Sequence, residues 1–163
     1  MLFRSAAATA SAAVSDNVHD VLRGGLGQIP KTSRLYRCIT RLLDKAASGA
    51  ACADIFADIH CRYDENDAHD WCHTLSNAEI VSAALLYGGS FDECIGLAVQ
   101  TGFDTDCNGA TAGSLYGMMH GVGCIAQKWT EPIGSAVDTA LVGVGTVKVN
   151  DLVDLMMKHI SLK

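Results

Sequence analysis

The stretch GFDTDCNGATAGSLYGMMHG, residues 102–121, decides the fold that this sequence predicts. Glycines recur at every fourth position from Gly109 to Gly121, and no charged residue follows Asp106 within the stretch. Residues four positions apart lie on the same face of a helix. The pattern therefore predicts a helix with a glycine face, against which another backbone can pack closely.

Two carboxylates, Asp104 and Asp106, stand directly before this helix on either side of Thr105. In an extended turn, residues i and i+2 point to the same side, so both carboxylates can reach one point. Two close anions repel unless a cation or a proton lies between them, and oxygen ligands suit Mg²⁺, Mn²⁺ or Ca²⁺. A structural role is the alternative, because Asp106 can cap the helix where the helix dipole favours negative charge.

The composition describes one folded domain covering residues 1–163. A net charge of -6 without any run of Lys or Arg argues against a nucleic-acid partner. The charge-free segment 107–127 has the length of a membrane span, but Asn108, His120 and five glycines make it too polar for one. Seven cysteines without a CxxC pair favour free thiols and a cytoplasmic location.

Helical spacing of apolar residues recurs along the chain, and strand-like alternation is nearly absent, so we expect an all-α fold. Ser76 and Glu79 have the spacing of a capping box, which predicts that a helix begins there and runs to Gly88. The polar segment 59–74 is typical of a loop. Besides the glycine helix, the sequence predicts helices over residues 6–22, 33–47, 90–100, 133–142 and 149–160.

A second set of possible metal ligands lies between residues 52 and 73. Zinc binds such cysteine and histidine side chains, but their spacing matches no usual zinc finger. Free thiols and loop histidines are the favoured interpretation, and a small zinc-binding helical protein stays open as an alternative. The set consists of Cys52, His60, Cys61, His69, Cys72 and His73.

Residues 102–117, GFDTDCNGATAGSLYG, resemble the C-terminal motif of the ADP-ribosylglycohydrolases. Members typically read Gly-x-Asp-Thr-Asp, followed by Asn, small residues and spaced glycines. The preceding WCHTLSNAEIVSAALLYGGSFDECIGLAVQ, residues 71–100, is also similar to that family. The resemblance implies an all-α, orthogonal multi-helix bundle. It is apparently partial, because the Thr-Asp-Asp set of the family's N-terminal half does not occur in this chain.

The resemblance also implies a site that holds two divalent cations, usually Mg²⁺, with Mn²⁺ possible. The motif assigns metal ligation to Asp104 and Asp106, and to Cys107, which occupies a position that is often Thr or Ser. It assigns no catalytic residue. The upstream loop implies substrate-facing positions along the ADP-ribose cleft at His73, Thr74 and Leu75.

The activity that the resemblance implies is hydrolysis of the bond at the anomeric carbon of ADP-ribose. The partner would be an ADP-ribosylated protein or a small molecule that contains ADP-ribose. Because one half of the ligand set is missing, we expect the isolated chain to have little activity and to need a separate N-terminal half or self-association. A non-catalytic ADP-ribose-binding or structural relative of the family is the alternative.

Overall fold

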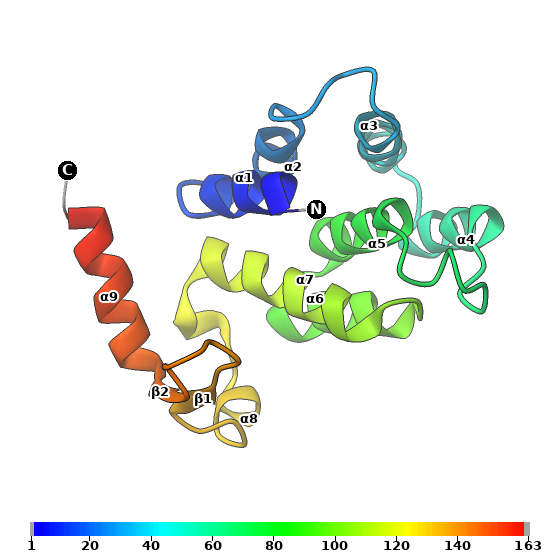
Figure 1. The fold of residues 1–163 in the computed structure, drawn as a ribbon. Helices are drawn as coiled ribbons and strands as arrows, with labels where there is room; N and C mark the ends of the chain where they lie inside the picture. The colour runs from blue at the N-terminus through cyan, green and yellow to red at the C-terminus, as the bar shows by residue number, and fades with distance from the viewer. Residues whose placement is uncertain (1, 162–163) are drawn as a thin grey trace. The chain divides into compact units, whose positions relative to one another are not determined.

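Figure 1 shows the computed structural model of the protein, which describes residues 2–161. The chain is predominantly helical, which confirms the predicted all-α class. It divides into two compact units, Met1–Ile125 and Ala126–Lys163, each of which is described by itself. The first unit holds α1 (Leu2–Ala12), α2 (Val18–Leu26), α3 (Arg34–Ala47), α4 (Cys52–Arg62), α5 (Thr74–Tyr87), α6 (Phe91–Gln100), α7 (Thr105–His120) and the short 3₁₀ helix η1 (Val122–Cys124).

Helix α5 is the centre of the first unit. All of its residues from Leu75 to Leu85 are buried, and it contacts α2, α3, α4, α6 and α7. A helix that is enclosed on every side needs apolar residues around its whole circumference, which this sequence largely supplies. The core cluster beneath it combines Ile80 and Ala83 of α5 with Leu42 of α3 and with Ile55 and Ile59 of α4.

Helix α6 packs against the glycine face of α7, and the two helices run side by side (Figure 1). A Cβ atom at Gly109 would lie 3.1 Å from Cγ2 of Val99, and one at Gly113 would lie 3.3 Å from Cδ1 of Ile95. Both distances are shorter than ordinary van der Waals contact, so the absent side chains allow α6 to approach. The close packing is as predicted, although side chains of α6 rather than its backbone occupy the glycine face.

A buried ion pair joins the end of α4 to α5. Glu79 is 1% exposed, and Arg62 donates two hydrogen bonds to its carboxylate, one of them 2.9 Å long. Arg62 also donates to Asp58, at 3.1 Å. Burial alone would lower the pKa of Arg62, but the hydrogen bonds and the charge of Glu79 outweigh burial and raise it. The guanidinium group therefore stays charged and fixes the position of α4 against α5.

Two predictions about where helices begin and end were wrong. Residues 6–22 form two helices, because Asn17 caps α2 by accepting hydrogen bonds from the backbone N–H groups of His19 and Asp20. Helix α5 begins at Thr74 with His73 as its N-cap, three residues before the predicted N-cap Ser76. Ser76 lies inside that helix, and its hydroxyl donates to the carbonyl of His73 instead of capping, at 3.0 Å.

Two predictions about loops and late helices also need correction. The segment 59–74 is a loop only after Arg62, because α4 runs from Cys52 to that residue. In place of the helix predicted over residues 133–142, the second unit has the antiparallel pair β1 (Ala136–Asp138) and β2 (Thr146–Lys148). Gly134, which lies inside the predicted span, has φ +72°, a conformation that interrupts a helix.

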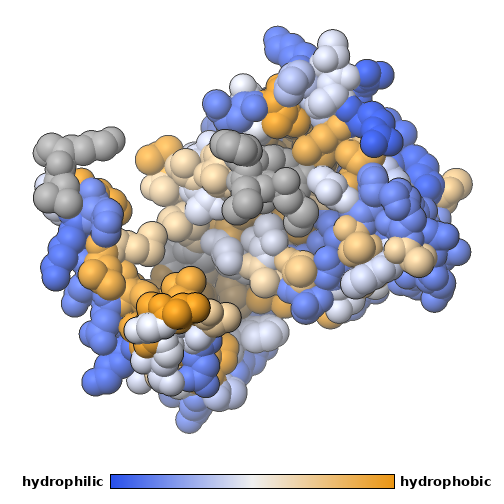
Figure 2. Space-filling model, viewed as in Figure 1, coloured by the Kyte–Doolittle hydropathy of each residue, from blue (hydrophilic) through white to orange (hydrophobic). Residues whose placement is uncertain are grey.

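The rest of the second unit consists of α8 (Gln127–Thr130) and α9 (Val149–Ser161). Helix α9 lies at the position predicted for the last helix. Hydrophilic and hydrophobic side chains both face solvent along it (Figure 2). Its exposed apolar residues are Val149, Val153, Leu155, Met156, Met157 and Ile160.

The close packing of the turn after α5 predicts that a side chain at Gly88 destabilises the fold. A Cβ at Gly88 would lie 2.6 Å from Cα of Cys94 and 2.7 Å from the carbonyl oxygen of Ala84. Because these are backbone atoms, Gly88→Ala should lower the free energy of unfolding by about 1–3 kcal/mol, measured by urea denaturation.

Gly123→Ala is the matched control, because nothing lies within 4 Å of the Cβ that it would add. It should change the free energy of unfolding by less than about 0.5 kcal/mol. Equal losses in the two variants would contradict the packing described for this turn.

Candidate metal centre at the start of helix α7

The loop before α7 has an unusual backbone. Gly102 has φ +80°, and Phe103 is the only non-glycine residue with a positive φ, +61°, in the part of the chain that the structure describes. A left-handed conformation at a residue with a side chain costs roughly 1–2 kcal/mol. Asp104 follows at φ -83° and ψ 72°, and the N–H of Thr105 donates to the carbonyl of Phe103 at 3.0 Å. This is an inverse γ-turn centred on Asp104.

Helix α4 and the loop after it hold this strained turn in place. The imidazole of His60 donates from Nε2 to the carbonyl of Thr101 at 3.0 Å. Its ring centroid lies 5.0 Å from that of Phe103, which also packs against the core cluster. The carboxylate of Glu65 occupies the space that a side chain at Gly102 would need. Contacts of this kind allow a strained backbone to persist, and such strain is frequent at functional sites.

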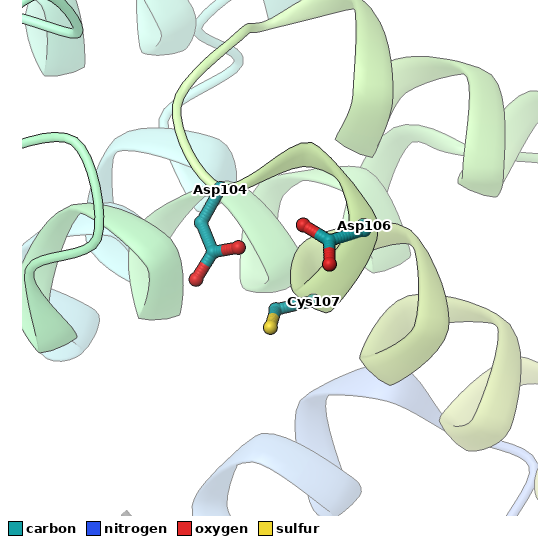
Figure 3. Close-up of side chains that lie close together, drawn as sticks. All are labelled: Asp104, Asp106 and Cys107. Carbon is teal, nitrogen blue, oxygen red and sulfur yellow. The ribbon is translucent and has the colours of Figure 1, made fainter.

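The turn and the first turn of α7 bring three predicted ligands together (Figure 3). Asp104, Asp106 and Cys107 each offer a ligand atom, and these atoms lie within 4.8 Å of one another. Asp104, not Asp106, is the N-cap residue, so the predicted cap was assigned to the wrong aspartate. The Asp104 side chain accepts no hydrogen bond from the helix N–H groups. The helix dipole still favours both negative charges at this end.

Two buried asparagines orient the Asp104 carboxylate. Nδ2 of Asn108 donates to Oδ1 of Asn77, and Nδ2 of Asn77 donates to Oδ2 of Asp104, both at 3.2 Å. Asn77 and Asn108 are each 2% exposed, so their amide groups need protein partners. The sequence reasoning missed this pair. The available signal was an Asn at the fourth residue of each of two helices, α5 and α7.

The Cys107 thiol is exposed beside the two carboxylates. Its hydrogen bond to Asp104 raises its pKa, and the negative charge of Asp104 and then that of Asp106 add to the effect. The thiol therefore stays protonated near neutral pH, and a thiol is a poor ligand for a hard cation. The carboxylates of Asp104 and Asp106 do fit Mg²⁺, which commonly binds one or two carboxylates and keeps several waters. Ligation by Cys107 stays a prediction.

The predicted substrate-facing residues lie at the start of α5, two to four residues before Asn77. Nδ1 of His73 accepts a hydrogen bond from the N–H of Leu75 at 3.2 Å. Thr74 is exposed and Leu75 is buried. His73 and Leu75 both line a cavity of about 490 Å³, whereas Thr74 is not among its lining residues. Contact of these three residues with substrate stays a prediction.

The zinc alternative finds no support in the geometry. Among residues 2–161, the cysteines and histidines between positions 52 and 73 form no group of three converging ligands. All seven cysteines are free. None of the helices in the described range combines the length and the hydrophobicity that crossing a membrane requires.

The environment of Cys107 predicts a change in thiol reactivity. Asp104→Asn removes the charge that contributes most to the raised pKa of Cys107. The thiolate fraction should rise, and alkylation by iodoacetamide at mildly alkaline pH should become several-fold faster, because the thiolate is the nucleophile. Site-resolved mass spectrometry measures the rate, and the exposed Cys61 serves as the internal control. A Cys107 rate that is unchanged or slower would contradict the assigned environment.

Comparison with known proteins agrees with the motif that forms this site. The family model described as ADP-ribosylglycohydrolase matches residues 4–159, nearly the whole chain. No curated protein and no solved structure matches it. The family match covers the central buried helix, the glycine-faced helix and the carboxylate turn between them. The chain belongs to the ADP-ribosylglycohydrolase family.

Proposed function

We propose that this chain contributes the carboxylate side of a metal-dependent ADP-ribosylglycohydrolase active site. Its reaction is hydrolysis of the glycosidic bond that joins ADP-ribose to a modified protein or to a small-molecule acceptor. Membership of the family points to a glycohydrolase in general. The observation that carries the more specific proposal is the convergence of the Asp104 and Asp106 carboxylates at the start of α7.

In this proposal Asp104 and Asp106 hold Mg²⁺, with Mn²⁺ as a possible substitute. Once bound, the cation supplies Lewis-acid polarisation of a ribose hydroxyl and of a water molecule. Asn77 positions one oxygen of Asp104 by donating to it, and Asn108 positions Asn77 in turn. Hydrogen bonds of this kind fix the orientation of a ligating side chain and support its affinity. His73, Thr74 and Leu75 are the proposed substrate-facing residues.

The chain by itself supplies an incomplete ligand set. The sequence contains no Thr-Asp-Asp set. In the described range, the group at Asp104, Asp106 and Cys107 is the only one in which three potential ligand atoms converge. A dinuclear centre would therefore need further ligands from residues outside this sequence or from another copy of the chain. We expect the isolated chain to bind ADP-ribose but to hydrolyse its conjugates very slowly.

A non-catalytic ADP-ribose-binding or structural relative is the second candidate. The observation that favours it is the identity of the residue beside the two carboxylates, Cys107. Sulfur is a poor ligand for a hard cation, so Cys107 replaces an oxygen ligand that the family motif often supplies as a hydroxyl. The two candidates differ in whether divalent metal changes the affinity for ADP-ribose.

Calorimetric titration of the chain with ADP-ribose, with and without Mg²⁺, tests the proposal. Mg²⁺ should tighten binding, and Asp104→Asn with Asp106→Asn should abolish that increment while leaving the metal-free affinity intact. Cys107→Ala tests whether the thiol is a metal ligand. The gain in ADP-ribose affinity caused by Mg²⁺ should survive this substitution if the two carboxylates are sufficient to hold the cation. An affinity indifferent to Mg²⁺ would favour the non-catalytic relative.

The same preparation tests the incompleteness of the site. Release of free ADP-ribose from an ADP-ribosylated peptide is measured for the chain alone in Mg²⁺. Release should stay near the uncatalysed level, because ligands for a second cation are missing from the sequence. Robust Mg²⁺-dependent release by the chain alone would overturn this part of the proposal.

A further inference from the structure

Four of the six arginines of this acidic protein line one cavity of about 490 Å³. The chain as a whole carries a net charge of -6, so this concentration of guanidinium groups is local. The sequence shows no basic run, because the fold brings the arginines together from two helices. We call it the arginine cavity; its lining consists of Arg34, Arg37, Cys38, Arg41, Arg62, Tyr63, His69, Asp70, His73 and Leu75.

Helical geometry places three of the arginines on one side of α3. Arg34, Arg37 and Arg41 are spaced i, i+3 and i+7, which puts them along one face. The facing wall comes from the end of α4 and from the loop before α5. It is held in place by the buried ion pair between Arg62 and Glu79.

The two pairs of arginines differ in charge compensation. Arg41 and Arg62 both form ion pairs with Asp58 and with Glu79. Arg34 and Arg37 are exposed, and no carboxylate of the described residues lies within ion-pair distance of either of them. Asp70 is the acidic member of the lining, and it pairs with neither. The cavity therefore keeps positive charge that the protein does not neutralise.

Flat aromatic surfaces stand on the side opposite α3. The rings of Tyr63 and His73 are stacked, with centroids 6.1 Å apart and an interplanar angle of 25°. His69 adds a tilted ring 5.2 Å from His73. Arg62 lies over the Tyr63 ring, with its Cζ atom 5.1 Å from the ring centroid. The cavity thus combines the uncompensated guanidinium groups of Arg34 and Arg37 with a facing wall of packed aromatic rings.

We propose that the arginine cavity binds a phosphate-bearing ligand of nucleotide size, whose phosphate oxygens are contacted by Arg34 and Arg37. The planar guanidinium group donates paired hydrogen bonds that match phosphate geometry. The volume lies within the range of about 300–1,000 Å³ that is usual for small-molecule sites. The diphosphate is the shared chemistry of two sources, the ADP-ribose of the proposed substrate and a separate nucleotide. The site does not depend on the carboxylates of Asp104 and Asp106.

Calorimetric titration of the full chain with inorganic pyrophosphate tests the site. EDTA is present, so that no divalent cation bridges the probe to Asp104 and Asp106. The double variant R34Q/R37Q should weaken pyrophosphate binding by at least about tenfold, because hydrogen bonds to charged groups are lost. Arg23→Gln is the matched control, since Arg23 is an exposed arginine of α2 that lines a different cavity. It should leave the affinity within about twofold of the original, as expected for a distant surface charge.

Circular dichroism establishes that the variants keep their helices, and Arg37→Gln alone replaces the double variant if that one unfolds. Failure of the original chain to bind pyrophosphate would overturn the proposal, as would equal affinity in R34Q/R37Q. Competition by ADP-ribose, weakened in R34Q/R37Q to the same extent, identifies substrate as the source of the phosphate. Competition by ADP or ATP but not by ADP-ribose identifies a separate nucleotide. If Mg²⁺ does not change the affinity for ADP-ribose, the metal-site proposal fails, but the affinity for pyrophosphate in EDTA is unaffected. The two proposals can therefore fail independently.

Discussion

Helix α5 buries the amide group of Asn77 and the carboxylate of Glu79, and the rest of the structure depends on how these groups are satisfied. A buried amide or carboxylate without a partner would cost several kcal/mol, so each must find one. Asn77 donates to Asp104 and thereby orients the candidate metal ligand. Glu79 takes two hydrogen bonds from Arg62 and thereby fixes one wall of the arginine cavity. The requirement that stabilises the core also positions both proposed sites.

Much of the fold could be predicted because apolar spacing alone specifies an amphipathic helix. Residues 33–47, 90–100 and 149–160 form helices where the pattern places them. The errors arose where a single polar residue competes with the pattern. Asn17 divides the first predicted helix by capping the second, and a histidine caps α5 in place of the expected serine. Such choices depend on local hydrogen bonds that hydrophobic periodicity does not contain.

The candidate metal site was only partly visible in the sequence. The spacing of Asp104 and Asp106 was sufficient to predict that two carboxylates could converge, because neighbouring positions on a turn stay close in any fold. The contribution of Asn77 was not visible, since it comes from a residue 27 positions away on another helix. The grouping of the four arginines of the cavity was not visible in the sequence, because α3 and α4 come together only through the core that both share with α5.

Paramagnetic broadening by Mn²⁺ in ¹H–¹⁵N NMR spectra tests most directly whether Asp104 and Asp106 hold a divalent cation. At substoichiometric Mn²⁺, the backbone amides of residues 104–108 and the side-chain amide of Asn77 should broaden before any others. Asp104→Asn should remove this selectivity. Broadening centred on the acidic loop that contains Asp64 and Asp67, or a pattern that survives Asp104→Asn, would contradict the assignment of the metal site.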